Sequence, residues 1–100
     1  KKSINVTKNL LTKIRAVIKS DNAYMVNCAN IPTGANKYWK LIANDSNFIP
    51  LDLPNIAIDK ALKKNENIFF SDLGHFNNYG NEIFGKAVFK QLKNYQDFNF

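Results

Sequence analysis

A chain of 100 residues with 45% hydrophobic and 22% charged side chains suits one small folded domain or part of one, and argues against disorder. Its single cysteine and single histidine exclude an internal disulfide, a cysteine-based zinc site and a multi-histidine metal site within the chain. The net charge of +6 is uneven, because residues 1–20 contain six basic residues and no acidic one.

The first predicted elements are a helix and a buried strand. Apolar residues recur at helical spacing across residues 7–19, and Thr7 is the expected N-cap of this helix. Residues 23–29 are nearly continuous in apolar character, which is typical of a strand buried on both faces of a parallel sheet. We expect Cys28, within this strand, to be a small buried hydrophobic residue rather than a nucleophile.

The middle of the chain repeats this alternation. The sequence predicts a short helix over residues 36–44, a second strand over 48–53 and a weaker helix over 56–64. Pro50 cannot donate a hydrogen bond within a sheet, so the second strand is expected at an edge, or with the position of that missing amide facing outwards.

The chain closes with a strongly amphipathic helix over residues 78–94, for which Asn77 is the expected cap. Residues 68–70 are apolar but too few to classify. Alternating helices and strands predict an α/β fold with a parallel sheet and helices on both faces. Four helices cannot wrap two parallel strands without leaving apolar surface exposed. We therefore expect the C-terminal part of a larger α/β domain, or one chain of a split domain.

A loop that contains the single histidine is the candidate site for acid-base chemistry. Asp72 and His75 are three residues apart in a segment that is expected to be a loop, with Gly74 allowing a tight turn. A carboxylate at this distance can accept a hydrogen bond from one imidazole nitrogen, so that the other can take a proton from a hydroxyl nucleophile. From the residues alone, a surface or packing role for His75 and a turn-forming role for Asp72 remain open.

The pattern Asp-x-x-His-x-Asn-x-x-Gly before a helix resembles the last conserved block of the SGNH (GDSL-type) hydrolases. The matching positions are Asp72, His75, Asn77 and Gly80. Residues 13–32 and 48–53 also resemble the C-terminal half of that family. The resemblance implies a three-layer αβα, flavodoxin-like SGNH hydrolase fold, of which residues 1–100 would form the C-terminal segment of a single domain.

The resemblance also implies a serine esterase or lipase that cleaves acyl esters, with no cofactor and no metal. His75 would be the general base and Asp72 the acid that orients it. Asn77 and Gly80 are interpreted as structural, the first as a helix cap and the second as a close-packing position. The nucleophilic serine and the oxyanion-hole blocks of the family are missing, because none of the chain's serines lies in such a block: Ser3, Ser20, Ser46 and Ser71.

Two alternatives remain beside the esterase. One is a glycan O-acetyltransferase or deacetylase of the same fold, which would use the same acyl-serine chemistry. The other is a non-catalytic basic module that binds polyanions through residues 1–20. No nucleic-acid partner is expected, because no aromatic residues are interleaved with these charges, and contact with a membrane surface has no further support. The expected partners are an acyl-ester substrate and the N-terminal remainder of the domain.

Overall fold

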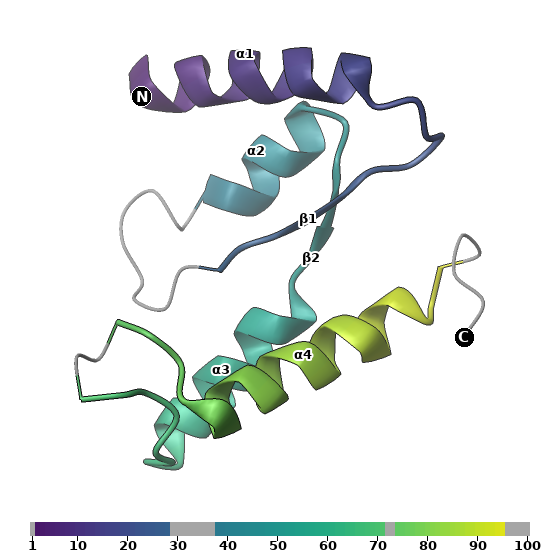
Figure 1. Cartoon of the computed structure of the whole chain (residues 1–100). Helices are drawn as coiled ribbons and strands as arrows, with labels where there is room; N and C mark the ends of the chain where they lie inside the picture. The colour runs from purple at the N-terminus through teal and green to yellow at the C-terminus, as the bar shows by residue number, and fades with distance from the viewer. Residues whose placement is uncertain (1, 29–37, 72–73, 96–100) are drawn as a thin grey trace. The chain divides into compact units, whose positions relative to one another are not determined.

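The computed structural model describes residues 2–28, 38–71 and 74–95 (Figure 1). The chain divides into two compact units, Lys1–Pro50 and Leu51–Phe100. The helices and strands, in chain order, are α1 (Lys2–Val17), β1 (Tyr24–Val26), α2 (Trp39–Asp45), β2 (Ile49–Leu51), α3 (Leu53–Lys63) and α4 (Asn78–Leu92). Within the described ranges, no helix combines the length and apolar character that a membrane span requires.

Helix α1 begins five residues earlier than the sequence predicted, and the expected N-cap at Thr7 was wrong. Thr7 lies inside the helix, where its hydroxyl donates to the carbonyl of Ser3 at 2.8 Å. A threonine can satisfy its hydroxyl in this way within a helix, and no glycine or proline precedes it to stop the helix.

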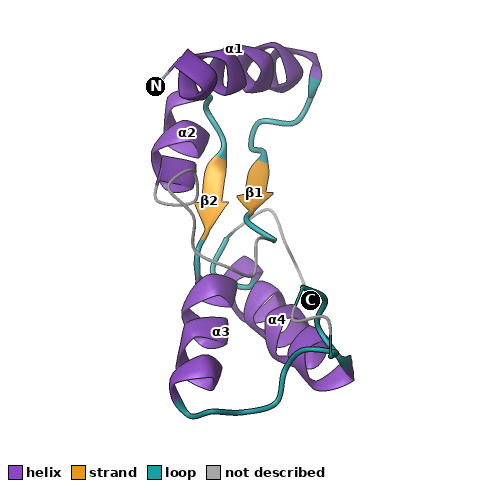
Figure 2. Cartoon of the chain, turned by 90° about the vertical axis from the view of Figure 1, so that its left-hand side faces the viewer, coloured by secondary structure: helices purple, strands orange, loops and turns teal. Residues whose placement is uncertain are grey.

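The two strands lie side by side and run parallel, and in the described part of the chain they form a two-stranded sheet (Figure 2). Each strand of such a sheet has an unpaired edge, which is the position expected for Pro50. Burial of the first strand on both faces was wrong, because the three residues of β1 are only partly buried. Cys28 lies beyond the end of β1 and is exposed, contrary to expectation. The three-layer αβα arrangement stays a prediction.

The core of the first unit is small. Ala23, Ala43 and Phe48 are buried, and Leu11 and Met25 pack against them. The hydrogen bond from the Ile49 amide to the Ala23 carbonyl, 2.7 Å, brings the beginnings of the two strands together. Apolar residues before each strand therefore meet one face of α1 and α2.

Arg15 connects three segments of the first unit. Its guanidinium donates to the carbonyls of Asn47 at 2.8 Å and Asp21 at 2.9 Å, and more weakly to those of Ile18 and Ser20. The two stronger acceptors lie in the turns that precede β2 and β1. This basic residue is therefore part of the internal hydrogen bonding of the unit.

Helix α1 also carries an exposed apolar stripe. Its members recur at helical spacing, and each is more than half exposed: Val6 55%, Leu10 55%, Ile14 51% and Val17 74%. Exposed apolar residues that line up along one helix are unusual on a finished protein surface. The stripe is therefore an apolar surface of the kind that often marks an interaction site.

The second unit is built on the packing of α3 against α4. Ile58, Ala61 and Ile68 are buried there, and Ile83 and Phe84 of α4 pack against them. Helix α3 begins three residues earlier than predicted, because proline at position 54 lies in its first turn, where a missing amide costs nothing.

One glutamine joins the start of α3 to the end of α4. The Gln91 side-chain oxygen accepts from the Leu53 amide at 2.8 Å, and its nitrogen donates to the Asp52 carboxylate at 3.2 Å. This satisfies a backbone donor that the first turn of a helix leaves without a helical partner.

Candidate functional site

The loop that contains His75 is closed by a short antiparallel bridge. Phe69 pairs with Phe76. The Phe70 amide donates to the His75 carbonyl at 2.9 Å, and the Asn77 amide donates to the Ile68 carbonyl at 2.9 Å. The segment 68–70, which the sequence left unclassified, therefore forms one side of a hairpin-like closure, and His75 lies on the other side.

The residue after His75 anchors the loop in the core. The Phe76 ring stacks on that of Phe69, with centroids 5.6 Å apart and planes 11° apart, and it contacts the Phe84 ring at 5.7 Å. Aromatic contacts of this kind restrict the backbone on which they are mounted. The main chain of His75 is thus held between the Phe70 hydrogen bond and a packed ring, while the His75 residue itself is exposed.

The predicted partner of His75 is not among the described residues. Asp72 lies outside them, so the hydrogen bond between Asp72 and His75 stays a prediction. Ser71, at the other end of the loop, is exposed. Ser46 is 1% exposed, and its hydroxyl donates to the Ile42 carbonyl at 2.7 Å, which assigns it to the structure of α2 rather than to catalysis.

Asn77 caps α4, as the sequence predicted. Its side-chain oxygen accepts from the Gly80 amide at 2.9 Å. Its side-chain nitrogen donates to the Asn67 carbonyl at 2.9 Å and approaches the Phe69 carbonyl at 3.4 Å. One amide group therefore fixes both the start of α4 and the strand-like segment on the far side of the histidine loop.

We expect Asn77→Ala to lower the free energy of unfolding by about 1–2 kcal/mol, since it removes both the cap and the bond to Asn67. Urea denaturation followed by far-UV circular dichroism measures the change. The neighbouring exposed residue provides the control, because Asn78→Ala should stay within about 0.5 kcal/mol of the parent. Equal losses in the two variants would contradict the role assigned to Asn77.

Gly80 permits a close approach between α4 and the segment before the loop, which confirms its interpretation as a packing position. A Cβ atom placed there would lie 2.3 Å from the Ile68 carbonyl oxygen and 3.0 Å from the Phe76 side chain. The carbonyl is also the acceptor for the Asn77 amide. A side chain at position 80 would therefore push against the same backbone that closes the histidine loop.

Tyr79, in the first turn of α4, is 45% exposed. Its hydroxyl donates to the Glu66 carboxylate. This hydrogen bond and the charge of Glu66 raise the pKa of Tyr79 above its ordinary value of 10.0. The contact links the chain after α3 to the first turn of α4 and adds a polar tie beside the aromatic one.

The sequence predicted the cap at Asn77 and the close packing at Gly80, but it did not predict their support by Ile68, Phe69 and Glu66. The apolar residues 68–70, directly before the Asp72–Gly80 pattern, indicated a buried segment there. They could not indicate which residue this segment pairs with.

Among residues 2–28, 38–71 and 74–95, no three metal-binding side chains gather into a metal site. Searches of protein-family models, curated proteins and solved structures found no match for this chain. The assignment of a function therefore depends on the histidine loop and on its resemblance to the SGNH block.

Proposed function

We propose that this chain supplies the base and the orienting acid of a serine esterase of the SGNH type. The observation that carries the proposal is the supported position of His75, directly before the bridge of Phe69 with Phe76 and two residues before the Asn77 cap of α4. Sites in α/β proteins are commonly built from loops next to helix N-termini, mounted on rigid elements.

In the proposed reaction, His75 takes the proton of a serine hydroxyl as the serine oxygen attacks the ester carbonyl. The protonated imidazole then donates that proton to the departing alcohol, and an acyl-serine remains. A water molecule, deprotonated by His75 in turn, attacks the acyl carbonyl, and the imidazolium returns the proton to the serine oxygen as the bond to the acyl group breaks and the carboxylic acid leaves. Asp72 would accept a hydrogen bond from the other ring nitrogen and stabilise the imidazolium that forms in each step.

The serine and the oxyanion hole would come from the remainder of the domain. Two features of the described residues support a larger assembly: a parallel sheet of two strands, and the α1 stripe of Val6, Leu10, Ile14 and Val17. Parallel sheets are normally buried beneath helices on both faces. Added strands would extend the sheet, and the α1 stripe could then pack against the larger apolar face.

The basic-module alternative is weakened by the contacts of its own residues. Arg15 donates to backbone carbonyls, and Lys8 forms an ion pair with Asp45 at 2.8 Å. These cations are therefore engaged within the first unit.

The esterase and the acyltransferase share the same residues, so competition between water and a sugar acceptor, followed by product analysis, distinguishes them.

A fluorophosphonate probe tests the proposal, because it reacts with an activated serine and releases fluoride. We expect the full-length protein to be labelled on one serine, which lies outside residues 1–100 or enters from a second chain. Mass spectrometry identifies the labelled residue, and heat-denatured protein is the control. Labelling of Ser71, or no labelling of the native protein, would contradict the proposed division of roles.

A further inference from the structure

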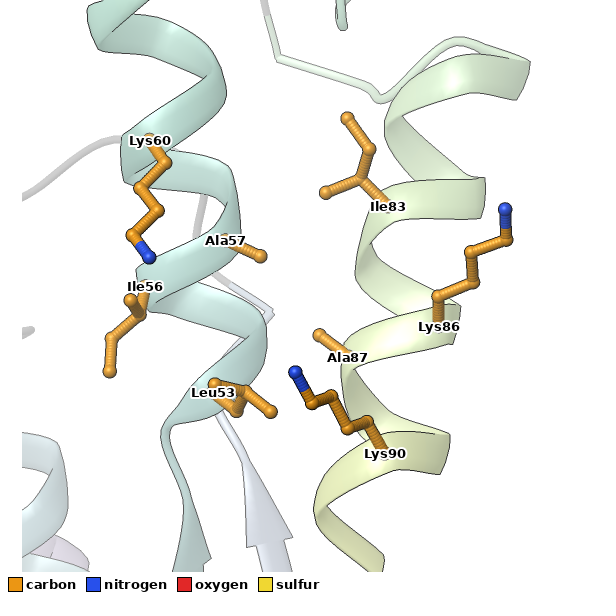
Figure 3. Close-up of a pocket in the computed structure, with 8 residues that line it drawn as sticks. All are labelled: Leu53, Ile56, Ala57, Lys60, Ile83, Lys86, Ala87 and Lys90. Atoms are coloured by element: carbon orange, nitrogen blue, oxygen red, sulfur yellow. The ribbon is translucent and has the colours of Figure 1, made fainter.

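A groove lies between α3 and α4 within the second unit (Figure 3). Its volume is about 340 Å³, which falls in the range of small-molecule sites. The apolar part of its lining comes from Leu53, Ile56 and Ala57 on α3 and from Ile83 and Ala87 on α4. The two alanines leave room between the helices that larger side chains would fill.

The polar part of the lining is entirely cationic. Lys60 of α3 and Lys90 of α4 border the groove, together with Lys86. In Figure 3 the Lys90 side chain extends into the space between the helices, whereas the Lys86 side chain runs along α4. Lys86 forms an ion pair with Glu82 at 2.9 Å, so its charge is already partly balanced. Lys90, which extends between the helices, and Lys60, whose side chain runs along α3 on the side away from α4, thus give the lining of the groove its positive charge.

An apolar floor beneath two cations fits a ligand that has an apolar chain and an anionic head. We propose that the groove binds a medium-chain fatty carboxylate. The chain would lie against Ala57, Ile83 and Ala87, where its methylene groups leave water. The carboxylate would accept charge-assisted hydrogen bonds from Lys60 and Lys90. The volume suits a small amphiphile better than a helix of a partner protein.

Decanoate, kept below its micelle concentration, is the probe, and isothermal titration of the full-length protein is the measurement. We expect saturable binding with one decanoate per chain. The double variant Lys60→Gln/Lys90→Gln should weaken binding at least about fivefold. Lys63→Gln is the matched control, because Lys63 is an exposed lysine on α3 outside the groove, and it should leave binding unchanged.

Ala57→Leu tests the apolar floor by filling the groove, and it should abolish binding while circular dichroism remains that of the parent. Decyltrimethylammonium, which has the same chain and the opposite charge, should not bind. Equal binding by the double lysine variant, or no saturable decanoate binding by the parent, would overturn the proposal. A change in oligomeric state on Ala57→Leu would also overturn it, because the groove would then be an interface.

The groove proposal does not depend on the esterase. His75→Ala should bind decanoate as tightly as the parent, whatever its activity. Unchanged hydrolysis by His75→Ala would contradict the esterase alone, whereas no saturable decanoate binding by the parent would contradict the groove alone.

Discussion

Replacing His75 with alanine should lower kcat for a short-chain p-nitrophenyl ester by about 10²–10⁴-fold in the full-length or reconstituted enzyme. The loss arises because the imidazole of His75 is the group that takes the proton as the serine oxygen attacks in the proposed reaction. Removal of a base that acts only in the transition state lowers kcat and kcat/KM by the same factor, so KM should change little. Initial rates of p-nitrophenol release, measured against substrate concentration, separate the two constants.

The control for this prediction lies in the same loop. Ser71 is exposed and receives no catalytic role, so Ser71→Ala should retain near-parental turnover. Asp72→Asn should lower kcat, because an amide cannot stabilise the imidazolium as a carboxylate does. Turnover unchanged by His75→Ala, or abolished by Ser71→Ala, would remove the basis of the proposed function.

Alanine should have opposite effects at two positions of α4. Gly80→Ala should lower the free energy of unfolding by about 1–3 kcal/mol, because its methyl group would overlap the Ile68 carbonyl and force the backbone apart. The substitution also disturbs the amide that Asn77 caps. Urea denaturation with far-UV circular dichroism measures the loss.

Gly85 provides the matched comparison on the same helix. A Cβ atom placed there meets nothing within 4 Å, so Gly85→Ala should raise stability by up to about 1 kcal/mol through helix propensity alone. A gain of stability in both variants would show that propensity, and not the contact with Ile68, decides the outcome at Gly80.

The sequence predicted α4 well because two independent signals agreed there. Apolar periodicity located the helix, and Asn77 supplied the acceptor that a helix start requires. The start of α1 was missed because Thr7 has two satisfactory states, as a cap or as an internal residue bonded to Ser3. Local sequence alone does not choose between these states.

The support of the site could be predicted only in part. Residues 68–70 gain their structure from pairing with Phe76, which no local pattern around them encodes. Cys28 was expected to be buried because its neighbours are apolar, but β1 ends before it. The structure of residues 68–70 depends on a pairing partner, and the exposure of Cys28 depends on where the strand ends. The local sequence pattern contains neither piece of information.

The guanidinium of Arg15 aligns the starts of β1 and β2 in the first unit. By donating at once to the Asp21 and Asn47 carbonyls, it ties together the two places where the chain turns into β1 and β2. Its fork of fixed donors makes this geometry, which a single ammonium could not reproduce. The starting points of β1 and β2 are therefore matched by a single side chain, and a substitution of Arg15 would release both turns at once.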